Sequence, residues 1–190
     1  MKIGVLAIQG SVREHISILS KLGVKAIGVK RAEDLHDIDG LIIPGGESTT
    51  IGKLMKKHGL DQEIVKRYQR GMSIYGSCAG AILLAKGVNV KQPGLGLMDI
   101  SVIRNGYGRQ IDSFEEELEI SDIGKFKGVF IRAPVVDNVY DGVKVLCKLD
   151  GRPVMAEQGH LMITTFHPEL TDDSRIHKKF IEMVKYNRML

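Results

Sequence analysis

The chain has 190 residues with 43% hydrophobic and 26% charged side chains, so it can bury a core without disulfides or a structural metal. The formal net charge of +4 is spread over basic residues interleaved with acidic ones, which argues against a nucleic-acid partner. No apolar run approaches the roughly 20 residues of a membrane span, and we expect one cytoplasmic domain over residues 1–190, without contact to a membrane.

The first half of the chain alternates apolar runs with amphipathic segments. Residues 2–8 are almost continuously apolar, which is typical of a strand covered on both faces. Ser11 and Glu14 then match an S-x-x-E capping box, which predicts a helix to about Leu22. The pattern further predicts strands at 24–29 and 39–43, helices at 49–58 and 61–70, and a strand just before Cys78. This rhythm favours an α/β fold with a mainly parallel sheet and helices on both faces.

Three loops follow predicted strands of this sheet. They contain Gln9 and Gly10, the glycine pair Gly45 and Gly46, and Cys78. Ligands of parallel sheets bind beyond the carboxyl ends of the strands. We therefore expect these loops, distant in sequence, to converge on one site.

The second half lacks helical periodicity until its end. Strand-like runs occur at 97–103, 114–120, 128–131, 143–149, 153–157 and 161–166. We expect them to extend the sheet with antiparallel strands, including a hairpin at Asp150 and Gly151. A last helix is predicted from Asp172 or Asp173 to about Arg188, with inward-facing Ile176, Phe180, Ile181 and Val184.

Cys78 lies in a Gly-Ser-Cys-Ala-Gly turn between a strand and a run of helix formers that extends to Ala85. Small neighbours allow the sharp bend of a nucleophile elbow, which exposes the side chain above the sheet. The dipole of the following helix favours a thiolate there. The alternative is a small buried hydrophobe, the usual environment of a free cysteine and the one we expect for Cys147.

The segment TFHPE places His167 and Glu169 two residues apart. Pro168 favours an extended His167, and alternate side chains of an extended segment point the same way. If Glu169 binds one ring nitrogen, the other can take a proton from Cys78. The alternative is a surface histidine beside a capping loop, which the cysteine elbow makes less attractive.

The PGGESTT loop is not a P-loop, because five residues separate Gly46 from Gly52 and Lys53 is followed by Leu54. Its amides suit an oxyanion, although an ordinary turn capped by Ser48 is the alternative. The histidines show no metal-ligand spacing, so no metal is expected. Glycine-rich and proline-bounded loops also present Arg104, Arg109 and Arg132, either as partners of a substrate carboxylate or as surface charges.

Taken in order, the motifs GVLAIQG, PGGESTT, YGSCAGA, RNGYGRQIDSF, VFIRAP and FHPELTDD resemble a known family from about Lys2 to Tyr186. They resemble the glutaminase subunits of pyridoxal 5'-phosphate synthase, which are triad (class I) glutamine amidotransferases. The resemblance implies a single flavodoxin-like domain that hydrolyses the side-chain amide of L-glutamine through a thioester, without a cofactor.

The resemblance also implies residue roles. Cys78 would be the nucleophile, His167 the base and Glu169 its orienting acid. The glutamine site would be formed by Gly46, Glu47, Ser48, Arg104, Ile131 and Arg132, and the oxyanion hole by the amides of Gly46 and Ala79. Ammonia would pass to a separate barrel-shaped synthase subunit within a large hetero-oligomer. We expect Gln9 and Gly10 near that contact, and docking to activate the glutaminase.

Two other functions remain open from the residues alone. Cysteine peptidases or deglycase-like enzymes carry an elbow cysteine, but with an acid where this chain has Gln9, and without a C-terminal His-Pro-Glu. A non-catalytic scaffold or a redox sensor would not need Cys78, His167 and Glu169 together.

Overall fold

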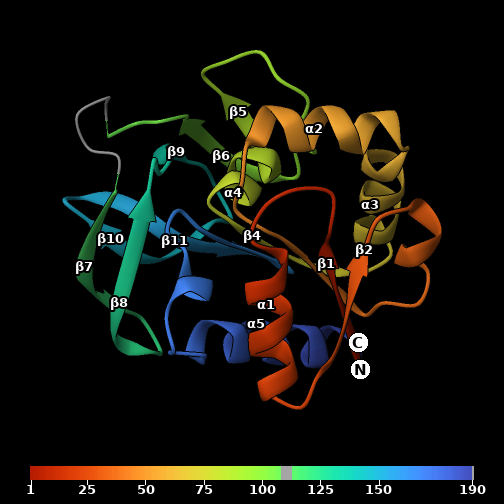
Figure 1. Cartoon of the computed structure of the whole chain (residues 1–190). Coiled ribbons are helices and arrows are strands. Elements are labelled where there is room, and N and C mark those ends of the chain that lie inside the picture. Colours follow the sequence, from red (N-terminus) through yellow and green to blue (C-terminus); the bar gives the residue numbers. More distant parts are fainter. Residues whose placement is uncertain (108–112, 190) are drawn as a thin grey trace.

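The computed structural model describes residues 1–107 and 113–189, with a seven-stranded sheet at its centre (Figure 1). Its strand order is β10-β11-β12-β4-β3-β1-β2. The bounds are β1 Lys2–Leu6, β2 Lys25–Val29, β3 Gly40–Ile43, β4 Ser73–Ser77, β10 Lys144–Leu149, β11 Arg152–Gln158 and β12 Leu161–Thr164. Strands β2, β1, β3, β4 and β12 pair in parallel, and β11 pairs antiparallel with β12 and β10. The predicted mainly parallel sheet is confirmed.

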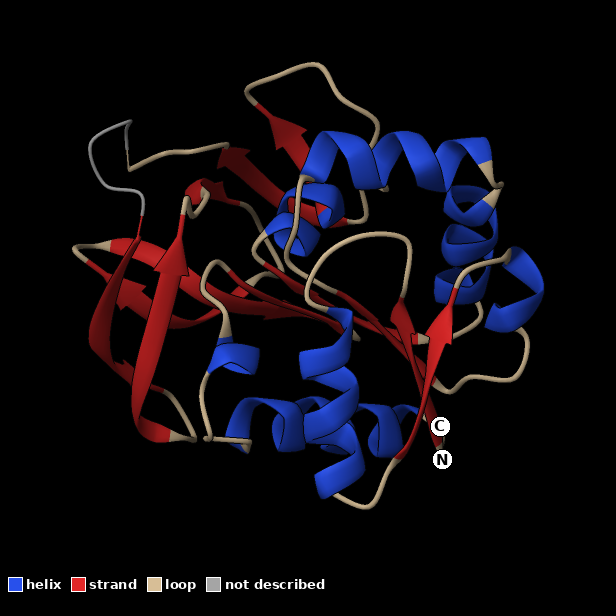
Figure 2. Ribbon diagram, in the orientation of Figure 1, coloured by secondary structure: helices blue, strands red, loops and turns tan. Residues whose placement is uncertain are grey.

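Helices cover both faces of this sheet (Figure 2). Helices α1 Val12–Lys21 and α5 Arg175–Asn187 pack on one face, and α2 Ser48–Lys57, α3 Leu60–Gln69 and α4 Ala79–Leu84 on the other. A short 3-10 turn, η1 Ala32–Leu35, follows β2. Strands β3 and β4 are buried along their whole length, as expected of strands covered on both sides. Within the described residues, no helix is long and apolar enough to cross a membrane.

The remaining strands form two small separate sheets. One contains β5 Ala85–Val88, β6 Met98–Ile103 and β9 Val135–Val139, and the other pairs β7 Ser113–Ile120 with β8 Gly124–Ile131. The prediction that the strands of the second half extend the main sheet is therefore confirmed for β10, β11 and β12 and was wrong for the strands of these two sheets. Strand β7 exposes its glutamates and buries Leu118 and Ile120, so the hairpin covers the core as a layer of its own.

The sequence did not predict two of the strands, but it correctly predicted one hairpin. Strand β5 begins at Ala85, which the sequence joins to a run of helix formers. Strand β9 is short and half exposed. The hairpin between β10 and β11 turns at Asp150 and Gly151, whose φ angles of 49° and 77° are those a type I′ turn needs.

The last helix keeps the predicted inward face, since Ile176, Phe180, Ile181 and Val184 are buried. It begins at Arg175 with Ser174 at the N-cap position, so the predicted start at Asp172 or Asp173 was wrong, although the Arg175 amide does donate to Oδ1 of Asp173 at 3.0 Å. The first helix is also where the sequence predicts it, but the prediction of a capping box at its start was wrong. Ser11 makes no side-chain cap bond, because its hydroxyl donates to Glu169 instead.

Candidate active site

Cys78 lies at a strained bend between β4 and α4. Its φ and ψ angles are 48° and −100°, a conformation that is unfavourable for a residue with a side chain. A Cβ atom on Gly76 would lie 2.5 Å from the Gly80 carbonyl carbon, and one on Gly80 would collide with the carbonyl oxygen of Ile43. The small residues are thus required for the turn, and the predicted elbow is present.

His167 and Glu169 lie directly behind the cysteine. His167 follows β12, and the 3-10 turn η2 Pro168–Leu170 carries Glu169. His167 Nδ1 lies 2.8 Å from Glu169 Oε1, both side chains are buried, and His167 lines the same cavity as Cys78. The prediction that the two face one site is right. The turn, rather than an extended segment, brings them together.

The electrostatics of this group favour an ionised carboxylate and a basic imidazole. Burial opposes the charge of His167, but the interactions with Cys78 and Glu169 outweigh it and raise the pKa of His167 to about 10. Burial likewise opposes ionisation of Glu169. The contacts with His15 and His167 and the hydroxyl of Ser11 outweigh it and lower the pKa of Glu169 to about 2. His167 is therefore well suited to accept the thiol proton.

The glycine loop between β3 and α2 passes over the cysteine. The Gly45 amide donates to Ser77 Oγ at 3.1 Å, and the Glu47 amide donates to Gln9 Oε1 at 2.8 Å. A Cβ on Gly46 would collide with Gln9, and one on Gly45 with the His167 ring, so only glycine allows this approach. The predicted convergence of the three loops is confirmed by these contacts.

Two amides in this region could serve an oxyanion. Gly46 lies between the two anchored amides of the loop. Ala79 is the first residue of α4, so its N–H has no acceptor within the helix. The alternative in which Ser48 caps α2 is wrong. Glu47 is the cap, and its carboxylate accepts from the amides of Thr49 and Thr50 at 3.2 and 2.7 Å.

A cavity of about 270 Å³ opens in front of the cysteine. Its wall is formed by Gln9, Gly46, Glu47, Ser48, Cys78, Ile82, Arg104, Asn105, Ile131, Arg132 and His167. All six residues predicted to bind substrate are among them. The sequence analysis missed Ile82 and Asn105. Ile82 lies one helical turn beyond Cys78, a spacing that could have identified it.

Charged groups of both signs face this cavity. Arg104 donates to Glu47 Oε1 at 2.6 Å and to Thr49 Oγ1 at 2.8 Å. Burial opposes ionisation of Glu47, but hydrogen bonds from Thr50 and Thr49 and the charge of Arg104 lower its pKa. Arg132 adds a second cation from a backbone with φ of 41°. Such a wall suits a zwitterion with a carboxylate and an ammonium group.

Other predicted groups lie elsewhere. Cys147 is buried in β10, and burial raises the pKa of its thiol to about 11, which makes it a poor nucleophile. Within the described part of the chain, no group of three His, Cys, Asp or Glu side chains could hold a metal ion. Arg109 lies outside the described residues.

Comparisons with a family model, with curated relatives and with solved structures agree with one another. The model of the SNO glutamine amidotransferase family matches residues 5–186. The pyridoxal 5'-phosphate synthase subunit PdxT of Carboxydothermus hydrogenoformans is 52% identical over 187 residues, 97% of this chain and 98% of that protein. Its counterpart in Thermotoga neapolitana is 50% identical over 188 residues, 97% of this chain and 100% of that protein. A crystal structure of a glutamine amidotransferase matches with a TM-score of 0.94 and 48% identity, covering 96% of this chain and 98% of that one.

Proposed function

The chain belongs to the SNO glutamine amidotransferase family, and from that premise we propose that Cys78, His167 and Glu169 hydrolyse L-glutamine in the cavity described above. The chain is a glutaminase subunit of pyridoxal 5'-phosphate synthase, because it belongs to a glutamine amidotransferase family and its relatives of about 50% identity are named as subunits of that synthase. The observation that carries the assignment of residues is the meeting of an elbow cysteine with a buried His–Glu pair at one cavity.

The first half of the reaction forms a thioester. His167 takes the proton of Cys78, and the sulfur attacks the side-chain amide carbon of glutamine. The oxygen of the tetrahedral intermediate becomes negative and is stabilised by the amides of Gly46 and Ala79. One such donor is typically worth about 3 kcal/mol in the transition state. His167 then protonates the nitrogen, the C–N bond breaks, and ammonia leaves.

The second half releases glutamate. His167, now neutral, removes a proton from water, and the resulting oxygen nucleophile attacks the thioester carbon. The C–S bond breaks and Cys78 recovers its proton. Throughout, ionised Glu169 holds the imidazole by its Nδ1 and stabilises the imidazolium form.

The charged wall of the cavity provides for the amino-acid end of the substrate. Arg104 and Arg132 can pair with its carboxylate, and Glu47 with its ammonium group. Gly46, Ser48 and Ile131 complete the site beside the scissile amide. This arrangement would discriminate against amides that lack the zwitterion, because they would gain no charged hydrogen bonds from the wall.

A partner takes up the ammonia. We propose that this partner is the synthase subunit, a barrel within a large hetero-oligomer. We further propose that it contacts this chain at Gln9, Gly10 and α1. Gln9 supports this location because it also holds the Glu47 amide. A partner that moves Gln9 would move the loop over Cys78. We further propose that residues 1–190 act as one glutaminase domain.

The test is release of glutamate and ammonia from L-glutamine by wild type and by Cys78→Ala, each alone and with a purified synthase subunit. We expect release that needs both the thiol and the partner. Equal release without the partner would contradict the docking switch but keep the triad. No release in any mixture would favour the peptidase-like or scaffold alternatives.

A further inference from the structure

A shell of polar side chains, formed by Ser11, His15 and His177, lies behind Glu169, and the reaction described above does not use it. Ser11 and His15 are one turn apart on α1 and face the same carboxylate oxygen. Ser11 Oγ donates to Glu169 Oε1 at 2.6 Å, and His15 Nε2 lies 3.6 Å from that oxygen. The side chains of His15 and Glu169 are fully buried.

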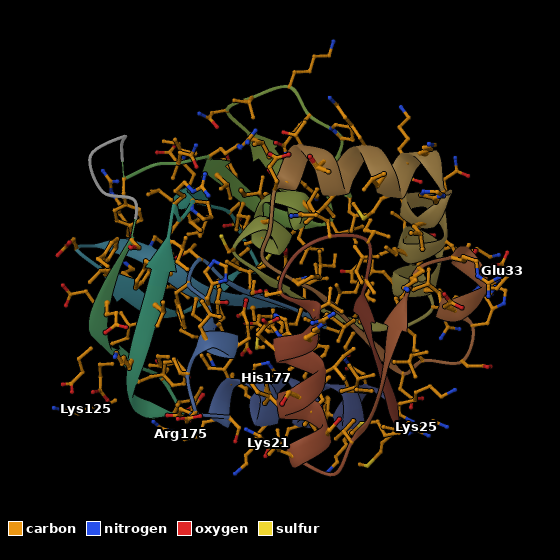
Figure 3. All side chains as sticks on the ribbon, viewed as in Figure 1. Lys21, Lys25, Glu33, Lys125, Arg175 and His177 are labelled. Atoms are coloured by element: carbon orange, nitrogen blue, oxygen red, sulfur yellow. The ribbon has the colours of Figure 1, made fainter. Side chains whose placement is uncertain are left out.

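His177 on α5 continues this shell, where α1 crosses α5 (Figure 3). Its Nε2 lies 2.9 Å from His15 Nδ1, and its own Nδ1 is buried without a hydrogen-bond partner among the described residues. A buried N–H without an acceptor costs more than a bare ring nitrogen, so the proton of His177 is assigned to Nε2. His177 therefore donates to His15.

This assignment fixes the proton of His15. Because His15 Nδ1 accepts from His177, its proton lies on Nε2, which faces Ser77 Oγ at 3.2 Å and Glu169 Oε1 beyond it. Burial lowers the pKa of His15 and lowers that of His177 to about 3, so both rings are neutral. Ser11 thus donates a hydrogen bond to the carboxylate, and the neutral His15 ring turns its N–H edge toward the same oxygen without adding a charge.

The carboxylate itself is held on one side only. Oε1 accepts the hydroxyl of Ser11, contacts the His167 ring and faces His15 Nε2 at 3.6 Å, whereas Oε2 is buried and has no hydrogen-bond partner among the described residues. Rotation of the carboxylate about its last bond would be opposed only through Oε1. The donors on α1 therefore determine whether Oε1 stays aligned with His167 Nδ1.

We propose that Ser11 and His15 are positioning residues for Glu169, with His177 fixing the tautomer of His15. The inference rests on the proposed function, since Glu169 must orient the base. Ser77 Oγ accepts both His15 and the Gly45 amide, so the same histidine also supports the loop that carries the oxyanion amide. None of these three residues lines the substrate cavity.

The test compares His15→Leu, which removes the donor, with His15→Gln, whose amide nitrogen can replace Nε2, and with Ser11→Ala. His160→Gln is the matched control, because His160 bonds the Tyr68 carbonyl far from the triad. With the synthase subunit present, we expect kcat to fall about 10- to 100-fold in Ser11→Ala, as when a charged group loses a hydrogen bond, and by a similar factor in His15→Leu, with KM unchanged. His15→Gln should recover most of the loss.

The pH profile separates positioning from mere support of the fold. The titratable groups that face Glu169 or His15 are Glu14, Tyr75, His167 and His177. If Glu169 is misaligned, it stabilises the imidazolium form of His167 less, and the pKa of His167 falls. We therefore expect the limb of the kcat–pH profile that reports His167 to move to lower pH in His15→Leu.

Three outcomes can be told apart by running wild type and thermal unfolding in parallel. Inactive wild type would refute the proposed function itself. Active wild type with unchanged kcat in His15→Leu and Ser11→Ala would overturn the positioning role. Equal losses in His15→Leu and His15→Gln, matched by equal losses of thermal stability and an unmoved pH limb, would show a structural role only.

Discussion

The amide of Glu47 donates to the side-chain oxygen of Gln9 across 2.8 Å, which ties the loop over Cys78 to the end of the first strand. Ser11, two residues after Gln9, donates its amide to the Gly45 carbonyl at 3.1 Å. Residues 9–11 therefore hold the glycine loop by hydrogen bonds on both sides of Gly46. Any displacement of this segment is transmitted to the amide that we assign to the oxyanion.

Removing the Gln9 side chain should loosen this loop. In Gln9→Ala, with the synthase subunit present, we expect kcat for glutamine hydrolysis to fall roughly 5-fold, because a net hydrogen bond is worth about 1 kcal/mol. Exposed Gln69 at the end of α3 provides the control Gln69→Ala. Unchanged docking and turnover in Gln9→Ala would refute our placement of the partner contact.

Arg104 should contribute to substrate binding more than to chemistry. It lies on the cavity wall and donates to Glu47 and Thr49, and in the part of the chain that the structure describes it makes no hydrogen bond with any residue of the triad. In Arg104→Ala we expect KM for glutamine to rise about 10- to 100-fold, since a charged hydrogen bond contributes about 1.5–3 kcal/mol. Steady-state kinetics would check this, with exposed Arg70→Ala as the control. A fall in kcat at constant KM would contradict the assignment.

The parallel sheet and the elbow could be predicted because each depends on local pattern, whereas the residues of the cavity wall followed from the family resemblance. Alternation of apolar runs and helices places strand ends at one edge, and small residues around Cys78 are needed for the bend itself. The family motifs then identified all six wall residues that we expected to bind glutamine.

The remaining features depend on contacts distant in sequence. Ser11 matches the capping-box pattern, yet its hydroxyl donates to Glu169, which lies 158 positions away in the sequence. His15 and His177 look like ordinary helix residues until α1 and α5 are packed together. The separate β7–β8 sheet was missed for a similar reason, since alternation predicts a strand but not the sheet that it joins.

Gly80 should tolerate no side chain. A Cβ atom there would collide with the Ile43 carbonyl oxygen, which belongs to the sheet and cannot move aside. We expect Gly80→Ala to lower the free energy of unfolding by about 1–3 kcal/mol, as overpacking does. Denaturant unfolding would measure it. The control is Gly94→Ala in an exposed loop, where a Cβ would lie 3.2 Å from the Leu83 carbonyl oxygen. An equal effect of both substitutions would contradict the steric argument.

The buried histidines should make the protein sensitive to acid. The pKa of His177 falls from 6.5 to about 3 on burial, and the pKa of His15 is lowered as well. Below pH 6.5 the unfolded chain binds protons that the folded chain cannot bind. The free energy of unfolding should therefore decrease by about 1.4 kcal/mol per pH unit for each such ring, until the pH reaches its folded pKa.

Glu169 contributes in the same direction at lower pH. Its folded pKa of about 2 lies below the ordinary 4.5, so its stabilisation is present above pH 4.5 and is lost as the pH falls through 2. Denaturant unfolding of wild type, His177→Leu and the exposed control His58→Gln between pH 7 and pH 3 separates the groups. We expect the slope between pH 6.5 and 4.5 to be reduced in His177→Leu and unchanged in His58→Gln. A flat wild-type curve over that interval would mean that the two buried rings carry an extra proton in the folded state. The neutral tautomers assigned to His177 and His15 would then be wrong.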